Sequence, residues 1–303
     1  MLRFITALVL GLTLTACAST KTKEAPLEVR PAQITKTKYD PDGALEAARD
    51  LRGAGQKSES YKAYGVLLLR APKDYADKDD ALLEYADLAR SLGGSHDKYY
   101  AESRAAYNML SAPEDLSDEQ TRELTAGKAL LAAATGAHDL ETQLHKALAL
   151  NNDDVRLWNA LGRYHDNKED WLSAQDSYVS ALMAAHKSGA HQASAVNNLG
   201  MSFLNQGRLK EARSKFVQAV GMDKDNVVYD NNRRLTDVLA GDLDAAFDGV
   251  SSQRAAIIYN DAGVTAERMG SPARARRYYK QAITQSPTYF QMAALNLARI
   301  DGE

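Results

Sequence analysis

From residue 41 onward, apolar residues recur three and four positions apart, in segments long enough for helices and separated by short polar turns. The clearest case is 194–224, where Ala212, Phe216 and Ala219 lie four and three positions apart after a glycine-containing turn. This spacing places the apolar side chains on one face of a helix, so it predicts a helical hairpin. The same pattern on both sides of this stretch predicts an all-α chain built from repeated hairpins.

Glycines set the register of these hairpins. Small and aromatic residues follow Gly162, Gly200 and Gly263 at the same offsets of 12, 16 and 19 positions. They are Ala174, Tyr178 and Ala181, then Ala212, Phe216 and Ala219, then Ala275, Tyr279 and Ala282. Small residues let two helices approach closely, and the aromatic ring fills the space between hairpins. We therefore expect these three hairpins to pack in the same way.

The Leu199-Gly200 pair, followed by residues at these offsets, resembles the signature of a tetratricopeptide repeat (TPR), whose period is about 34 residues. The resemblance implies an all-α fold, a TPR α-solenoid of about seven hairpins in a right-handed superhelix, with a capping helix over 290–300. Degenerate units occupy 41–154, and better-preserved units occupy 155–303. Such arrays present an extended binding surface, which favours a binding protein over an enzyme.

Two departures from the repeat are visible. In the sixth unit Arg233-Arg234 replaces the Leu-Gly pair, and the second helix is about five residues short against the usual period. We expect looser packing there. Between the fourth and fifth units, an insertion at 186–191 predicts a longer turn that lengthens the helix ends.

Residues 1–17 have the pattern of a lipoprotein signal peptide. Arg3 precedes the apolar stretch 4–13, which is too short to span a bilayer because a spanning helix needs about 20 residues. The stretch leads to Leu-Thr-Ala-Cys, which resembles a bacterial lipobox and implies lipidation of Cys17, with acyl chains such as palmitate. The alternative is an ordinary secretory peptide with an incidental cysteine. Residues 18–40 are polar without an apolar period, which predicts a flexible tether.

Composition narrows the classes of function. A net charge of -3 does not fit a nucleic-acid binder, which would carry a strongly basic face. The single cysteine excludes an intrachain disulfide and a thiol cluster for a metal. The 45% of hydrophobic residues suffices for a large core.

No catalytic residue, metal ligand or cofactor site is predicted. Ser95-His96 follows two glycines, but no strand precedes it as a nucleophile elbow requires. Gly127-Lys128 lacks the earlier glycine of a phosphate-binding loop. The histidines lack the spacing of metal ligands.

A row of asparagines stands out among the polar residues. An asparagine lies three positions before the glycine position in each of units four to seven, and its next neighbour is Asn or Asp in three of them. An amide both donates to and accepts from a peptide backbone, so such a row can hold an extended protein segment. The alternative is that the amides cap or bridge adjacent helices. The predicted partner-binding groove consists of Asn159, Arg163, Asn197, Asn198, Asn205, Asn231, Asn232, Asn260 and Asp261.

Together, the lipobox, the tether and the repeats resemble the TPR lipoproteins that assist assembly of surface appendages in Gram-negative bacteria. The stretch 197–300 is most similar to the Tad-type lipoprotein of Flp pilus assembly. The resemblance implies an outer-membrane lipoprotein that faces the periplasm and binds the pilus secretin or its neighbours. A lipoprotein adaptor for peptidoglycan enzymes, outer-membrane protein assembly or another pilus is the alternative.

Overall fold

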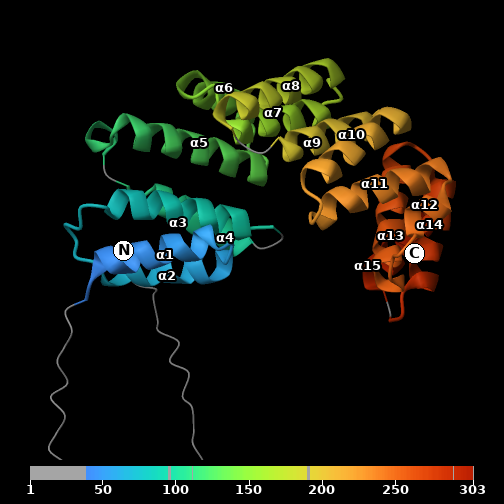
Figure 1. Cartoon of the computed structure of the whole chain (residues 1–303), viewed down its shortest axis with the longest axis horizontal. Helices are drawn as coiled ribbons and strands as arrows, with labels where there is room; N and C mark the ends of the chain where they lie inside the picture. The colour runs from blue at the N-terminus through green and yellow to red at the C-terminus, as the bar shows by residue number, and fades with distance from the viewer. Residues whose placement is uncertain (1–38, 95–96, 111, 190–191, 289, 303) are drawn as a thin grey trace, which may run out of the picture. The chain divides into compact units, whose positions relative to one another are not determined.

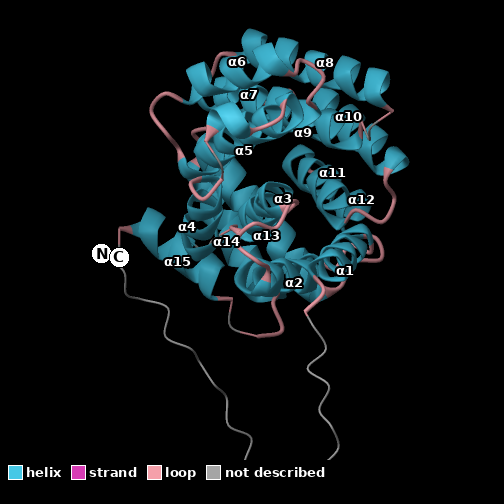
Figure 2. Cartoon of the chain, turned by 90° about the vertical axis from the view of Figure 1, so that its left-hand side faces the viewer, coloured by secondary structure: helices cyan, strands magenta, loops and turns pink. Residues whose placement is uncertain are grey.

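The computed structural model describes residues 39–94, 97–110, 112–189, 192–288 and 290–302 (Figure 1). Cys17, the predicted signal peptide and most of the predicted tether lie outside the described residues, as do Ser95 and His96. Every regular element within the described ranges is a helix, as Figure 2 shows. None of these helices combines the length and the apolar character needed to cross a membrane. They belong to one compact unit, Asp40–Glu303.

Fifteen α-helices and a short 3₁₀ helix follow one another in the described part of the chain. The first hairpins are α1 (Pro41–Gly53) with α2 (Lys57–Arg70), and α3 (Lys78–Leu92) with α4 (Asp97–Tyr107). After η1 (Pro113–Asp115) come α5 (Asp118–Thr135) with α6 (Leu140–Leu150), α7 (Val155–Asn167) with α8 (Trp171–Ser188), and α9 (Ala193–Asn205) with α10 (Leu209–Met222). The last are α11 (Val227–Ala240) with α12 (Leu243–Phe247), α13 (Ser252–Arg268) with α14 (Pro272–Gln285), and the single helix α15 (Gln291–Asp301). These are the seven hairpins and the final helix that the repeat pattern predicts.

Successive hairpins bury each other. In each hairpin the two helices pack along one another, and the first helix of the next hairpin packs on the second helix of the one before. The short α12 is the exception, and α13 packs against α11 instead. Each unit therefore depends on its neighbours for a core, as in a solenoid.

The glycine of each signature packs against the aromatic residue of its own hairpin. At Gly263 a Cβ atom would lie 2.3 Å from the ring of Tyr279, and at Gly162 and Gly200 it would lie 2.5 and 2.7 Å from the corresponding rings. No real Cβ atom tolerates such a separation, so only glycine fits here. The three rings are at most 1% exposed. The prediction that these hairpins pack alike is confirmed, but the closest contact of each ring lies within its own hairpin and not, as was expected, between hairpins.

In the third hairpin, the space beside the signature glycine is filled by a residue of another hairpin. Leu144 of α6 is fully buried on the inner face of its helix and is smaller than an aromatic ring. The space at Gly127 of α5 is filled by Tyr107 of the preceding hairpin, whose hydroxyl would lie 2.2 Å from a Cβ atom there. An aromatic ring from the neighbouring unit thus replaces the one that the third unit lacks.

The predicted departures in helix length are confirmed. The second helix of the sixth unit, α12, has 5 residues, against 14 in both α10 and α14. The insertion before α9 extends α8 to 18 residues, and Gly189 ends that helix in the left-handed conformation.

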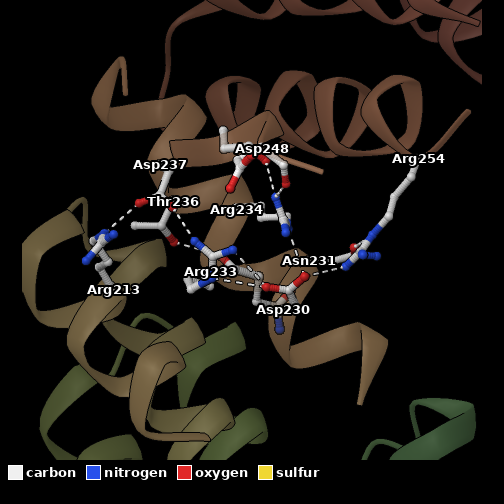
Figure 3. A network of polar contacts seen from close by, with 11 residues as sticks. Arg213, Asp230, Asn231, Arg233, Arg234, Thr236, Asp237, Asp248 and Arg254 are labelled. Atoms are coloured by element: carbon white, nitrogen blue, oxygen red, sulfur yellow. Dashed lines mark hydrogen bonds and ion pairs between the residues drawn. The ribbon is translucent and has the colours of Figure 1, made fainter. Parts of the chain in front are cut away.

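Charged side chains on α11 compensate for the shortened α12 (Figure 3). Arg234 donates to the carbonyl oxygens of Ala246 and Asp248, 2.8 and 3.0 Å away, and so holds α12 and the turn after it. Arg233 donates to Asp237 at 2.9 Å and to Asp230 at 2.8 Å. The arginine pair that replaces Leu-Gly therefore builds a polar network where we expected only looser packing.

Glu169 occupies a backbone conformation that the equivalent positions reserve for glycine. Its φ is 59°, while Gly207 and Gly270, at the same place in their turns, have φ of 74° and 68°. Replacing Glu169 with glycine is expected to raise the free energy of unfolding by about 0.5–1 kcal/mol, because the left-handed conformation strains a residue with a Cβ atom. Urea unfolding of Glu169→Gly measures the gain.

The matched control makes the reverse change in an equivalent turn. Gly270→Glu meets no neighbouring atom within 4 Å of its Cβ, so backbone strain alone should lower stability. Equal stability of Glu169→Gly and the parent chain would contradict the assignment of strain to this turn.

Candidate functional site

Amide side chains on successive first helices bond to each other. The Asn198 amide of α9 donates to the Asn159 oxygen of α7 at 3.0 Å. The Asn232 amide of α11 donates to the Asn197 oxygen of α9 at 2.8 Å. In each bond the acceptor lies three positions before the glycine position of one unit, and the donor lies two positions before the glycine position of the next unit. The row therefore links α7, α9 and α11.

The same contact closes the array at its C-terminal end. Asn296 of α15 donates to the Asn260 oxygen of α13 at 3.1 Å. Asn296 was not among the predicted residues, although the sequence signals it: Asn-Leu-Ala at 296–298 repeats Asn-Leu-Gly at 198–200. Leu295 stands where the next acceptor would lie, which ends the row.

The row is interrupted between α11 and α13. Asp261 occupies the donor position there, and a carboxylate cannot donate when ionised. Arg254 takes its place, with Nε 2.7 Å from the Asn231 oxygen and Nη2 2.7 Å from Asp230. Burial raises the pKa of Asp261, and only a long bond from Asn260, 3.5 Å, opposes that shift.

Burial limits what the row can offer to a partner. Asn159, Asn197 and Asn260 are only 8, 6 and 5% exposed. Arg163 is exposed and Asn205 is half-buried. These contacts are the helix-bridging role that the sequence left open as the alternative. Binding of a partner by the row stays a prediction.

A charged groove follows the first helices of units one to four. A cavity of about 530 Å³ and an adjoining one of about 370 Å³ share Arg49, Leu83, Glu84, Glu119 and Glu123. Residues of α1, α3, α5 and α7 contribute to the lining. Its charged groups are five carboxylates and three guanidinium groups, from Asp80, Glu84, Asp87, Glu119 and Glu123 and from Arg49, Arg52 and Arg156. We call this the acidic groove.

Ion pairs across neighbouring helices order the charges of the acidic groove. Arg49 of α1 donates to Glu84 of α3 at 2.6 Å, and Arg52 donates to Asp87 at 3.1 Å. Arg156 of α7 donates to Glu123 of α5 at 3.2 Å. Both pairs between α1 and α3 span 35 positions, about one repeat, so the signal was present in the sequence. These residues were not among the predicted site residues, because the recurring asparagines pointed to units four to seven.

Arginines around the acidic groove keep one of its carboxylates, Asp87, ionised at neutral pH. Burial alone would raise the pKa of Asp87, but the guanidinium groups of Arg90, Arg156 and Arg52 outweigh burial and hold that pKa below its ordinary value. Burial, with the Asp87 charge nearby, raises the pKa of Tyr107 to about 12. Glu119 is exposed, and the Glu123 side chain is 49% exposed, so both are accessible to a cation from outside.

Neither the acidic groove nor the row of asparagines has the arrangement of a metal site. Within the described ranges, no three His, Cys, Asp or Glu side chains are placed to hold a metal ion.

A family model described as a tetratricopeptide repeat matches residues 193–226 and 256–289. The chain contains TPR units. The fold is an all-helical, TPR-type α-solenoid, a class that typically serves as a non-catalytic scaffold. No curated protein sequence matches the chain.

Solved structures share the TPR architecture at low identity. A tetratricopeptide repeat protein from Parabacteroides merdae is 12% identical, with a TM-score of 0.51, over 87% of this chain and 99% of that one. The human IFIT1 dimer with m7Gppp-AAAA is 14% identical, with a TM-score of 0.58, over 86% of this chain but only 63% of IFIT1. Pseudomonas aeruginosa pilF is 14% identical, with a TM-score of 0.44, over 74% of this chain and 96% of that one. The similarities to the first two proteins concern the fold alone, and function has to be argued from the site.

Proposed function

We propose that this chain is a TPR scaffold that holds a basic, extended segment of a protein partner in the acidic groove. The observation that carries the proposal is the excess of carboxylates over guanidinium groups along α1, α3, α5 and α7. Complementary charge steers a partner and fixes its register. A TPR array supplies the extended surface that such a segment needs.

Within the acidic groove, Glu119 and Glu123 are the expected contacts for lysine or arginine of the partner. The carboxylates of Glu84 and Asp87 already pair with arginines of α1. Glu123 shares Arg156 with Asp154, which lies closer to that guanidinium, at 2.7 Å. Glu119 and Glu123 are exposed and have little or no cation of their own, so their charge is available to a partner.

The cellular setting of the proposal rests on the N-terminal sequence. Lipidation of Cys17 would anchor the chain at the outer membrane, and the tether 18–40 would let the TPR unit face the periplasm. The resemblance of 197–300 to the Tad-type lipoprotein supports a partner in a pilus or secretion machine, with the secretin as first candidate. The partner of another envelope process is the alternative.

The binding site is tested with Glu119→Lys combined with Glu123→Lys. A fluorescent 12-residue peptide rich in lysine serves as the probe for the full chain, and anisotropy gives its Kd. Reversal of two charges at the contact is expected to weaken binding by at least about tenfold, and rising salt should weaken binding to the parent chain. Glu59→Lys combined with Asp225→Lys changes net charge equally at exposed positions outside the groove and should leave the Kd unchanged.

The proposed partner and membrane anchor are tested by separate measurements. Affinity purification from solubilised native envelopes should recover a pilus or secretin component with the parent chain and lose it with the groove variant. Recovery of peptidoglycan enzymes instead would support the alternative partner class. Equal peptide binding by both charge variants would refute the acidic groove as the site, and membrane retention of Cys17→Ser would refute the anchor.

A further inference from the structure

Helix α5 carries a second groove, on the side away from the acidic groove. It has 18 residues, while its flanking helices α4 and α6 have 11 each and cover only part of its length. A cavity of about 560 Å³ lies between α5 and α6, with Leu116, Leu124 and Leu150 in its lining. An adjoining cavity of about 310 Å³ reaches Arg104 of α4. We call the two cavities together the α5 groove, because both are lined by Lys128 and Gln143.

The charge of the α5 groove is uniformly positive. Arg104, Lys128 and Lys146 line it, and no carboxylate does. None of the three cations forms an ion pair with a described residue. An apolar floor with unpaired cations at its rim is complementary to an apolar surface bordered by carboxylates.

The helical period separates this groove from the acidic one. Glu119 and Glu123 line the acidic groove, while Thr121 and Thr125 line the α5 groove. Two positions along a helix correspond to a rotation of about 200°. These pairs of side chains therefore lie on opposite faces of α5, and the two grooves meet at Tyr107 of α4, which lines both. Because their charged groups are of opposite sign, the two grooves call for different ligands.

We propose that the α5 groove binds an amphipathic helix of a protein partner, with apolar residues on one face and Asp or Glu at its borders. The lining runs along α5 from Thr121 to Thr135. This length of helix is about 21 Å, which corresponds to about 14 residues of a bound helix. Apolar anchors at helical spacing fill such a groove, and the acidic residues pair with Lys128, Lys146 and Arg104. The chain then has two docking faces of opposite specificity, which goes beyond the binding of one basic segment.

The experiment uses a 14-residue labelled peptide with leucine on one helical face and glutamate elsewhere. The full chain, in nanodiscs of neutral phosphatidylcholine, should bind it, and Lys128→Glu combined with Lys146→Glu should weaken binding by at least about tenfold. Lys210→Glu combined with Lys224→Glu is the matched control, since both lysines are exposed and lie on or after α10. The control should bind as the parent chain does, and a peptide with lysine in place of glutamate should not bind the α5 groove.

Two further measurements decide the nature of the site. Leu150 is 45% exposed, so Leu150→Ser tests the apolar floor with little effect on the fold, and it should also weaken binding. Equal affinity of both charge variants for the acidic peptide would overturn the proposal. The proposal would also be overturned if Lys128→Glu with Lys146→Glu lost binding to phosphatidylglycerol vesicles but kept binding to the peptide. The groove would then recognise a lipid surface. Glu119→Lys with Glu123→Lys should leave acidic-peptide binding intact, which separates this site from the proposed function.

Discussion

Arg233→Leu is expected to lower the free energy of unfolding by about 3 kcal/mol, although leucine is the residue that the TPR signature has at this position. The reason is the carboxylate of Asp237, which is 1% exposed and accepts from Arg233 at 2.9 Å. Without Arg233 this buried charge retains only Arg213, 2.6 Å away. Removing one partner of a buried ion pair costs more than the pair contributes, because the remaining charge stays desolvated.

Urea unfolding followed by circular dichroism measures this effect. Arg277→Leu provides the matched control, since Arg277 is exposed on α14 and the chemical change is the same. The double variant Arg233→Leu with Asp237→Leu should recover most of the loss, because it removes both charges together. A single variant as stable as the parent chain would show that the network of Figure 3 contributes little.

The pKa of Asp230 sets the lowest pH at which this network stays ionised. Partial burial would raise the pKa of this carboxyl, but hydrogen bonds from Arg234 and Arg233 lower it to about 2. A lowered folded-state pKa contributes stability above the unfolded pKa, and this contribution is lost as the pH falls toward about 2. The network should therefore persist in mild acid.

Tyr178→Phe is expected to lower stability by about 1.5–3 kcal/mol, through one lost hydroxyl. Its hydroxyl donates to the buried Asp166 at 2.7 Å, and Ser202 donates to the other oxygen at 2.7 Å. Asp166→Leu should cost a similar amount, because it leaves both hydroxyls without their acceptor. The fifth unit shows the apolar version of this pair, with Phe216 and Leu204, both fully buried.

The double variant Tyr178→Phe with Asp166→Leu copies that apolar pair and should restore stability. A double-mutant cycle from urea titrations gives the coupling energy, expected at about 1–3 kcal/mol. Tyr229→Phe, in a half-buried position on α11, is the control for a simple loss of a hydroxyl. Additive losses in the cycle would contradict a direct coupling between the two side chains.

The same cycle has a pH signature. Burial raises the pKa of Asp166 above its ordinary value, against the hydrogen bonds from Ser202 and Tyr178. A raised folded-state pKa gives stability that is complete below the unfolded pKa and is lost as the pH rises through the folded pKa. The double variant lacks this dependence. Its stability relative to the parent chain should therefore be greater at pH 7 than at pH 4.

The choice of tyrosine or phenylalanine at the aromatic position correlates with a second residue of the same hairpin. This correlation is present in the sequence, but the repeat pattern does not include it. In the units of Gly162, Gly200 and Gly263, the residue four positions after the glycine is a carboxylate where the aromatic is tyrosine, as with Asp166 and Tyr178, and leucine where the aromatic is phenylalanine. In the seventh unit Glu267 accepts from Tyr279 and from Arg299 of α15 at 2.7 Å. The rule could be found only after the structure showed which side chain meets the hydroxyl.

The interpretation of the asparagine row illustrates a different limit. Its period was visible, because one repeat separates its members. Whether each amide bonds to a neighbouring helix or stays free depends on the spacing and rotation of successive first helices, which periodicity does not specify. The structure shows that Asn296 extends the row and that Arg254 replaces the missing donor between α11 and α13. It also shows that three of the acceptors are buried.

By itself, the sequence determined the elements, their register and the number of hairpins. These follow from local spacing: apolar residues at helical period, glycine at turns, and a small residue wherever a ring must fit. The shortened α12 and the lengthened α8 were also local, since they are insertions or deletions against a fixed period.

Only the tertiary structure decided which side chains complete each other between units. Tyr107 fills the space at Gly127, Arg234 holds α12, and the two faces of α5 line grooves of opposite charge. Such contacts depend on the relative placement of neighbouring hairpins. The physical reason is that a charge or a ring is stabilised by whatever atoms lie within a few ångströms, and sequence distance does not measure that separation.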